Sequence, residues 1–198
     1  MLCTEVCSQC GLYYYTDNII IKPKGNITNP WIILIGETPS KEDVKNKEVF
    51  SGEIGKLLNT LIKPFGNIFY MTNAIKCYVP LKLKDISEEF NLCKNKQIRH
   101  CRYLLFKEIN DISKYTTKTP ILMTLGNTAF KSVMKINANY ITGNIYTTNI
   151  RDEYNLEGKR FNVIPNCHPQ HILKNYSKKD EFIHALDIAV KIYRKNKC

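Results

Sequence analysis

The alternation of apolar runs with segments of helical spacing constrains the fold of this 198-residue chain more than any other feature. The apolar runs are 31–36, 68–74, 120–126 and 161–165, and the segments with helical spacing are 52–65, 97–112, 127–136 and 180–195. Continuous apolar strands joined by amphipathic helices indicate a parallel sheet buried on both faces, because only crossover connections join parallel neighbours. We therefore predict an α/β fold, a three-layer α/β/α sandwich with a central, mainly parallel four-stranded sheet.

The ends of these runs are where a functional site is expected, because sheets of this class bind ligands outside the carboxyl ends of their strands. The segments at those ends read GETPS, TNAIKC, GNTAF and NCHPQH, and three of the four carry polar groups of catalytic type. Residues 139–151, with Gly143 and Asn144 at their middle, are interpreted either as a hairpin inserted between the last two units or as a loop.

The charge balance indicates a polyanionic partner. The chain has 29 Lys and Arg against 18 Asp and Glu, a formal net charge of +11, and basic surfaces bind nucleic acid by releasing condensed counterions. A lysine-rich surface without such a partner is the alternative. The length fits one domain over residues 1–198, expected to be monomeric. We also expect an intracellular protein without a membrane span, because no apolar run reaches about 20 residues and no signal-peptide pattern opens the chain.

Four segments carry a more specific signal, in the order 36–58, 70–77, 125–129 and 165–169. The first reads GETPSKED and then FSGEIGKLL, and it resembles the Gly-Glu-Ala-Pro-Gly and Phe-Val-Gly motif of family 4 uracil-DNA glycosylases. YMTNAIKC is similar to that family's Tyr-Ile-Thr-Asn-Val-Val-Lys-Cys, LGNTA to its Leu-Gly-x-x-Ala turn, and PNCHP to its His-Pro-Ser motif. The resemblance implies a DNA-repair enzyme of the uracil-DNA glycosylase superfamily, of the iron-sulfur type, that removes uracil from DNA after flipping the base into a pocket.

Three features depart from the family pattern. Ser40 replaces the last glycine of the first motif, Gln170 replaces the serine after His-Pro, and the stretch after Cys77 lacks the family's Arg-Pro-Pro. These departures leave the preferred substrate more open than the fold.

Glu37 and His168 are the candidate catalytic residues. Hydrolysis of an N-glycosidic bond passes through an oxocarbenium-like sugar, so a carboxylate at the position of Glu37 could orient water and stabilise positive charge. An imidazole at His168 could donate a hydrogen bond to the base that leaves as an anion. The alternatives are that Glu37 caps the next helix or pairs with a lysine, and that His168 is an ordinary loop residue with His171 as its competitor.

The resemblance places Gly36, Phe50, Gly52 and Asn73 around the substrate. The amide of Asn73 could donate to uracil O4 while it accepts from N3, and Phe50 would stack on the flipped base. Gly52 would allow the backbone to approach nucleic acid closely. A core aromatic at Phe50 and a turn-capping residue at Asn73 are the alternatives.

Four of the eight cysteines are candidate metal ligands, because disulfides are rare in a reducing compartment. Cys7 and Cys10 form a C-x-x-C pair, Cys77 follows the second motif, and Cys101 resembles the family's Cys-x-x-x-Leu segment. The resemblance implies a [4Fe-4S] cluster on these four thiolates, bound through an N-terminal arm. Cys93 is a rival for the fourth ligand, and tetrahedral zinc is the alternative to the cluster.

Three other functions remain open at this point. A non-catalytic iron-sulfur module on the same scaffold would bind DNA without releasing a base. A glycosylase could instead act on another deaminated or modified base. A thiol-disulfide oxidoreductase built on Cys7 and Cys10 fits less well, because that pair precedes the first strand instead of opening a helix after it.

Overall fold

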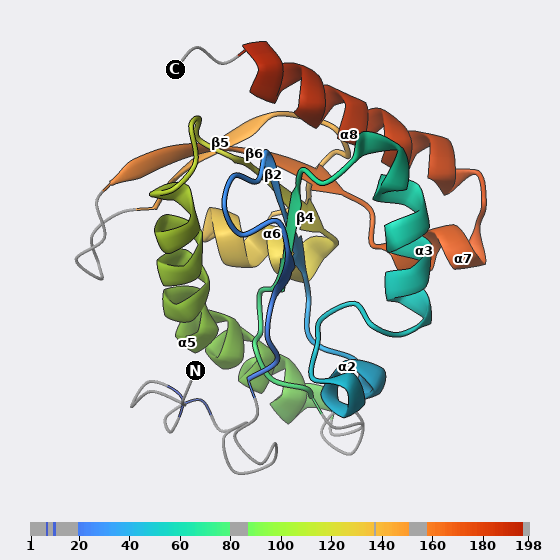
Figure 1. Cartoon of the computed structure of the whole chain (residues 1–198). Helices are drawn as coiled ribbons and strands as arrows, with labels where there is room; N and C mark the ends of the chain where they lie inside the picture. Colours follow the sequence, from blue (N-terminus) through green and yellow to red (C-terminus); the bar gives the residue numbers. More distant parts are fainter. Residues whose placement is uncertain are drawn as a thin grey trace.

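A six-stranded sheet forms the middle layer of the molecule (Figure 1). The computed structural model describes Cys7, Cys10 and residues 20–79, 87–136, 138–150 and 158–195, with only the backbone of residues 87–96. The strands, in spatial order, are β1 (Lys24–Gly25), β3 (Phe69–Asn73), β2 (Ile32–Gly36), β4 (Ile121–Leu125), β6 (Lys159–Asn166) and β5 (Tyr146–Ile150). The four central strands are parallel and correspond to the four predicted runs, which confirms the α/β prediction.

The sheet has two more strands than the four predicted, because β1 and β5 pair antiparallel at its edges. β1 is two residues long, too short for any periodicity, and β5 buries only alternate residues, so it lacks a continuous apolar run. Residues 139–145 form no strand, so the hairpin considered around Gly143 is not present. The antiparallel pair is instead made by β5 with β6.

Helices cover both faces of the sheet (Figure 1). One face is packed by α3 (Glu53–Ile62), α7 (Pro169–Lys174) and α8 (Lys178–Lys195), and the other by α5 (Ser87–Ser113) and α6 (Asn127–Met134). Side chains of strand β2 alternate between the two faces of the sheet. Ile32 and Leu34 pack in the apolar core on the side of α3, α7 and α8, whereas Ile33 and Ile35 pack in the core on the side of α5 and α6. The three layers predicted from the alternating pattern are therefore present.

The helices differ from expectation mainly in their starts. α5 begins at Ser87, before the segment in which apolar spacing is visible, so Cys101 lies inside this helix and does not open it. α2 (Lys41–Asn46), the 3₁₀ turn η2 (Lys63–Phe65) and α7 are too short for a periodic pattern to reveal them. Among the described helices, none has both the length and the apolar character needed to cross a membrane.

Candidate active site

The carboxyl ends of the parallel strands bring the predicted site residues to one edge of the sheet. Gly36 at the end of β2 is in register with Asn73 at the end of β3, and β4 and β6 end in register beside them. The pairing continues past the strands, because the Ile75 amide donates to the Glu37 carbonyl at 2.9 Å. Glu37 follows β2 and His168 follows β6, so two chain segments far apart in sequence meet at this edge.

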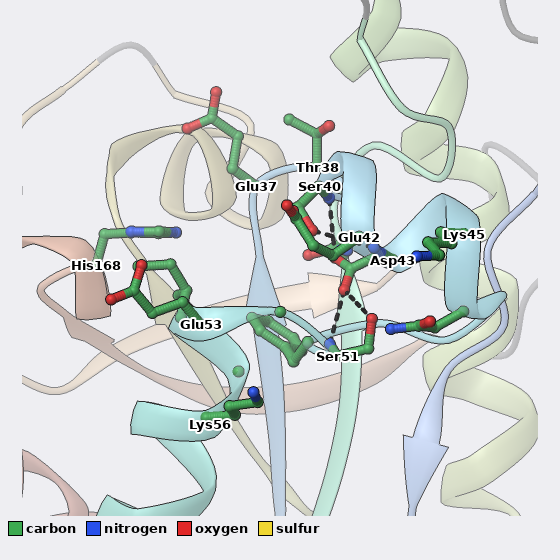
Figure 2. A pocket seen from close by; sticks show the side chains of 16 residues that line it. Glu37, Thr38, Ser40, Glu42, Asp43, Lys45, Ser51, Glu53, Lys56 and His168 are labelled. Atoms are coloured by element: carbon green, nitrogen blue, oxygen red, sulfur yellow. Dashed lines mark hydrogen bonds between the residues drawn. The ribbon is translucent and has the colours of Figure 1, made fainter.

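Two cavities adjoin at this edge, and Glu37 and His168 line both of them. The first has a volume of about 560 Å³ and is also lined by Phe50, Gly52 and Asn73. Figure 2 labels Glu37 and His168 among the side chains that line it. The second, of about 660 Å³, is bounded by polar groups from the turn between β4 and α6 and from the start of α7. Every predicted catalytic and substrate-binding residue therefore lines the first cavity, except the buried glycine that ends β2.

Gly36 forms the point where two of these side chains meet. A Cβ atom placed on Gly36 would lie 2.3 Å from Asn73 Oδ1 and 2.6 Å from Phe50 Cζ. The absence of a side chain at this position thus allows Asn73 and Phe50 to converge. Asn73 is only 3% exposed, and among the described residues no hydrogen bond engages its side-chain amide. Since buried amides are normally hydrogen-bonded, this group is suited to a ligand that enters the cavity.

Glu37 is half-buried, and helix capping does not explain its position. The residue that caps α2 is Ser40, whose hydroxyl accepts from the Asp43 amide at 3.1 Å. Glu37 also acts electrostatically on His168, where it partly opposes the lowering of the imidazole pKa by burial. The capping alternative is therefore excluded for Glu37.

His168 is the N-cap residue of helix α7 and is held in one tautomer. Its Nδ1 accepts a hydrogen bond from the Gln170 amide at 3.2 Å, so in the neutral ring the proton lies on Nε2. Burial lowers the pKa of His168 below its usual 6.5, an effect that Glu37 opposes and His171 reinforces. The imidazole is therefore neutral at pH 7, with an N–H available for donation.

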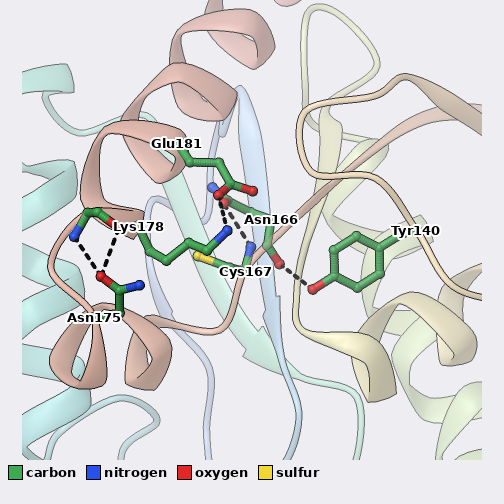
Figure 3. Close-up of polar contacts among 7 residues, drawn as sticks. Tyr140, Asn166, Cys167, Asn175, Lys178 and Glu181 are labelled. Atoms are coloured by element: carbon green, nitrogen blue, oxygen red, sulfur yellow. Dashed lines mark hydrogen bonds and ion pairs between the residues drawn. The ribbon is translucent and has the colours of Figure 1, made fainter.

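Asn166 anchors the loop that carries His168 (Figure 3). Its side chain donates to the Phe182 carbonyl of α8 at 3.0 Å and accepts from the Cys167 amide at 2.8 Å. Its carbonyl accepts from the Tyr140 hydroxyl at 3.1 Å. Two residues before His168, these bonds join the end of β6 to α8 and to the 138–145 segment. The sequence motifs did not assign Asn166 a role.

Asp43 joins the two loops that bear Glu37 and Phe50, a role the motif comparison did not reveal. Its buried carboxylate accepts from the Ser40 amide at 2.8 Å, and it accepts from the Ser51 amide at 2.7 Å and the Ser51 hydroxyl at 2.9 Å (Figure 2). The Ser-x-x-Asp spacing of a capping box could have indicated the bonds to residue 40. Nothing in the sequence indicated the bonds to Ser51.

Comparison with known proteins identifies the family. The profile described as "Uracil DNA glycosylase superfamily" matches residues 23–188. The chain belongs to the uracil-DNA glycosylase superfamily. The matched range contains every candidate site residue except Cys7 and Cys10, so the predicted family relationship is confirmed.

Within this superfamily, the chain is similar to proteins named type-4 uracil-DNA glycosylase. The relative from Thermotoga maritima is 27% identical over 179 residues, which cover 87% of this chain and 81% of the relative. The relative from Saccharolobus solfataricus is 26% identical over 174 residues, covering 85% and 73%. The relative from Archaeoglobus fulgidus is 23% identical over 179 residues, covering 89% and 82%.

All four predicted ligand cysteines of this superfamily member are buried, with 6% or 7% exposure. Cys10 and Cys101 belong to a small apolar cluster between the end of β3 and α5. Burial raises the pKa of the Cys101 thiol to about 11, the backbone of Lys76 lowers it by a hydrogen bond, and the neighbouring Cys10 and Cys7 raise it. Within the described residues, no group of three or more His, Cys, Asp or Glu side chains could hold a metal ion as placed.

Cys93 also lies on α5, but its side chain is outside the described part of the structure. At about 1.5 Å per residue, its eight-residue separation from Cys101 is about 12 Å along the helix axis. The structure places Cys101 beside Cys7 and Cys10.

A buried polar network links the cysteine region to the strand that carries Asn73. The Lys76 ammonium forms an ion pair with Glu108 of α5 at 2.8 Å and donates to Thr72 of β3 at 2.7 Å. The Tyr70 hydroxyl donates to the same carboxylate at 3.1 Å, and burial raises the pKa of Tyr70 well above its usual value. The ends of β3 and α5 are therefore joined by charge as well as by apolar packing.

Proposed function

We propose that this protein is a monofunctional DNA glycosylase that hydrolyses the N-glycosidic bond of uracil in DNA. The observation that carries the proposal is one cavity lined by a half-buried carboxylate, a neutral imidazole donor, a buried amide and an aromatic ring, contributed by Glu37, His168, Asn73 and Phe50. Membership of the superfamily and the names of the relatives support the same activity.

Glu37 is proposed to act on the sugar. As the glycosidic bond breaks, positive charge develops on the anomeric carbon, and a carboxylate beside it stabilises that charge and orients the attacking water. Glu37 is suited to this role because it lines both cavities and is not used as a helix cap. One cavity can hold the flipped base while the adjoining one accommodates the sugar and water.

His168 is proposed to act on the leaving base. The departing uracil carries negative charge on its carbonyl oxygens, and the neutral imidazole can donate from Nε2, since Nδ1 is occupied by the Gln170 amide. The lowered pKa favours this neutral form at pH 7. The preorganised donor needs no reorientation at the moment of bond cleavage.

Asn73 and Phe50 are proposed to recognise the base. The Asn73 amide can donate to O4 and accept from N3–H, a pattern that cytosine does not match. The Phe50 ring converges with Asn73 over Gly36, so it can stack on a base whose edge faces the amide. Gly52 opens α3 at the cavity wall and packs against Glu42.

Two of the three departures from the family pattern, Ser40 and Gln170, are compatible with this activity. Ser40 contributes a hydroxyl to the capping box of α2, so replacement of the family's glycine adds an anchor to the loop that carries Glu37. Gln170 acts on His168 through its backbone amide, which any residue except proline supplies. These two departures therefore do not favour the non-catalytic module.

The four buried thiols of Cys7, Cys10, Cys77 and Cys101 are proposed to hold a [4Fe-4S] cluster. The region supports this group because all four thiols are buried, Cys10 and Cys101 lie beside apolar side chains, and a hydrogen bond from the Lys76 backbone lowers the pKa of Cys101 and so favours its thiolate. A single zinc ion would need all four sulfurs about 2.3 Å from one centre. The cluster would serve as a structural link between the N-terminal segment, the end of β3 and α5. Four irons per chain are expected by metal analysis, whereas one zinc would contradict the proposal.

The substrate is proposed to be uracil-containing DNA, approached by a monomer. The formal charge of +11 favours a polyanion, because each phosphate contact releases counterions. The decisive assay measures base release from oligonucleotides that contain one uracil, single- or double-stranded, with hypoxanthine and hydroxymethyluracil substrates in parallel. Free uracil and an alkali-labile strand are expected. DNA binding without release of any base would instead identify a non-catalytic module.

A further inference from the structure

Phe50 has a backbone conformation that bulky residues rarely adopt. Its φ is +52°, in the left-handed region, where its Cβ crowds the neighbouring carbonyl. Such conformations persist only when the surrounding structure holds them, and they occur often at ligand sites. The ring of this residue lies at the candidate base pocket, so the conformation has a direct bearing on how the ring is presented.

The peptide group that joins Phe50 to Ser51 is held at both ends by opposite charges. The Lys24 ammonium of β1 donates to the Phe50 carbonyl at 2.9 Å, and the Asp43 carboxylate accepts from the Ser51 amide at 2.7 Å. Lys24 is itself oriented by an ion pair with Glu48 at 3.1 Å. Charge-assisted hydrogen bonds of this kind are stronger and shorter than neutral ones, so rotation of this peptide would break two strong bonds.

Helix α3 closes the remaining side of the same segment. A Cβ atom on Gly55 would lie 1.7 Å from the Phe50 carbonyl oxygen, so the backbone of Phe50 rests directly on this glycine. With Lys24, Asp43 and Gly55 around it, the residue is held from three elements, β1, α2 and α3.

We propose that Lys24 and Asp43 are positioning residues for Phe50. They fix the Phe50–Ser51 peptide, keep Phe50 in its left-handed conformation, and so present its ring beside Asn73 over Gly36, where the flipped base stacks. This inference rests on the proposed function for its catalytic consequence. Lys24 provides the clean test, because it lines neither cavity and, among the described residues, its ammonium contacts the Phe50 carbonyl and Glu48 but no cavity-lining side chain.

The test is a double-mutant cycle with Lys24→Met and Phe50→Ala, read as single-turnover uracil release and as melting temperature. Phe50→Ala removes the ring but keeps the carbonyl that Lys24 binds. Lys24→Met should therefore lower the melting temperature equally in both backgrounds. It should slow uracil release about tenfold when Phe50 is present, because small misplacement of a positioned group costs up to about 10²-fold, and less than about twofold when the ring is absent.

Two control variants accompany the cycle. Lys22→Met removes an exposed lysine from the same segment and should leave uracil release unchanged. Lys24→Arg retains a cationic donor and should restore release to within about threefold of the parent, on the same positioning argument. If Lys24→Met does not fold, Lys24→Gln takes its place in the cycle. Equal loss of activity in both backgrounds, or an equal effect of Lys22→Met, would overturn the proposal.

Failure of the proposed function is distinguishable from failure of this inference. A parent protein that releases no uracil contradicts the proposed function. The positioning of the Phe50–Ser51 peptide by Lys24 is then tested by the hydrogen exchange of the Ser51 amide, followed by NMR. Exchange should be at least about tenfold faster in Lys24→Met than in the parent, because opening of the peptide exposes the amide. Unchanged exchange would overturn the proposal that Lys24 positions this peptide.

Discussion

Gly36→Ala is predicted to disable the active site without unfolding the protein. The added Cβ would lie 2.3 Å from Asn73 Oδ1 and 2.6 Å from Phe50 Cζ, whereas ordinary contacts begin at 3.4 Å. Both side chains must therefore retreat by about 1 Å. A misplacement of this size costs up to about 10²-fold in rate, so we expect uracil release to slow by about 10²-fold. The backbone of Gly36 needs no left-handed conformation, so alanine introduces no torsional strain of its own.

Single-turnover release of uracil from a labelled oligonucleotide measures this effect, with DNA affinity and melting temperature determined on the same preparations. Gly66→Ala is the matched control. It lies outside the site with no atom within 4 Å of the added Cβ, but its φ of +79° makes alanine strained. With ψ at −164°, Gly66 occupies a region essentially confined to glycine, so this variant should lose about 1 to 3 kcal/mol of stability and retain full activity. A folded Gly36→Ala protein that released uracil within about threefold of the parent rate would refute the geometry of the base pocket, given the expected 10²-fold cost.

Three further predictions concern individual groups. Since burial lowers the pKa of His168 below 6.5, the neutral ring persists as the pH falls through 6.5. Uracil release should therefore decline only below that pH. An NMR titration that gives His168 a pKa at or above 6.5 would contradict this prediction. By linkage, His168 contributes stability above pH 6.5 that is lost as the pH falls toward its folded-state pKa. Asn73→Asp removes the donor to O4 and should abolish most uracil release while adding slight cytosine release, because the new carboxylate oxygen can accept from cytosine N4. Full uracil release would exclude Asn73 as the base reader. Protein that holds the proposed [4Fe-4S] cluster is expected to be brown. Cys101→Ala should lose this colour and the iron, whereas Cys93→Ala should keep both, and the reverse result would identify Cys93 as the ligand.

The central sheet was predictable because its four parallel strands are buried on both faces and therefore read as continuous apolar runs. The edge strands were not, since β5 buries alternate residues and β1 has only two. Helix α5 was underestimated for a similar reason: its first turns carry no clear apolar stripe, so the pattern marked only the part that packs on the sheet.

The residues proposed to contact the substrate could be predicted from the sequence, whereas the residues that fix the position of Phe50 could not. Glu37 and Asn73 follow strands at the edge where ligands bind, and the motifs gave them roles. Lys24, Asp43 and Gly55 act on the backbone of Phe50 from three separate elements. Their roles depend on which backbone atoms they approach in the folded chain, and no local spacing records that.

Single-turnover uracil release from the parent, Glu37→Gln and His168→Ala proteins, with DNA affinity measured in parallel, decides whether Glu37 and His168 form the catalytic pair of a uracil-DNA glycosylase. We expect the parent to release free uracil and to leave a strand that breaks only on alkali treatment. Each variant should be slower by about 10²-fold or more with little change in DNA affinity, because each loses a positioned catalytic group. Release at the parent rate by either variant, or a strand cleaved at the sugar by the protein itself, would contradict this assignment.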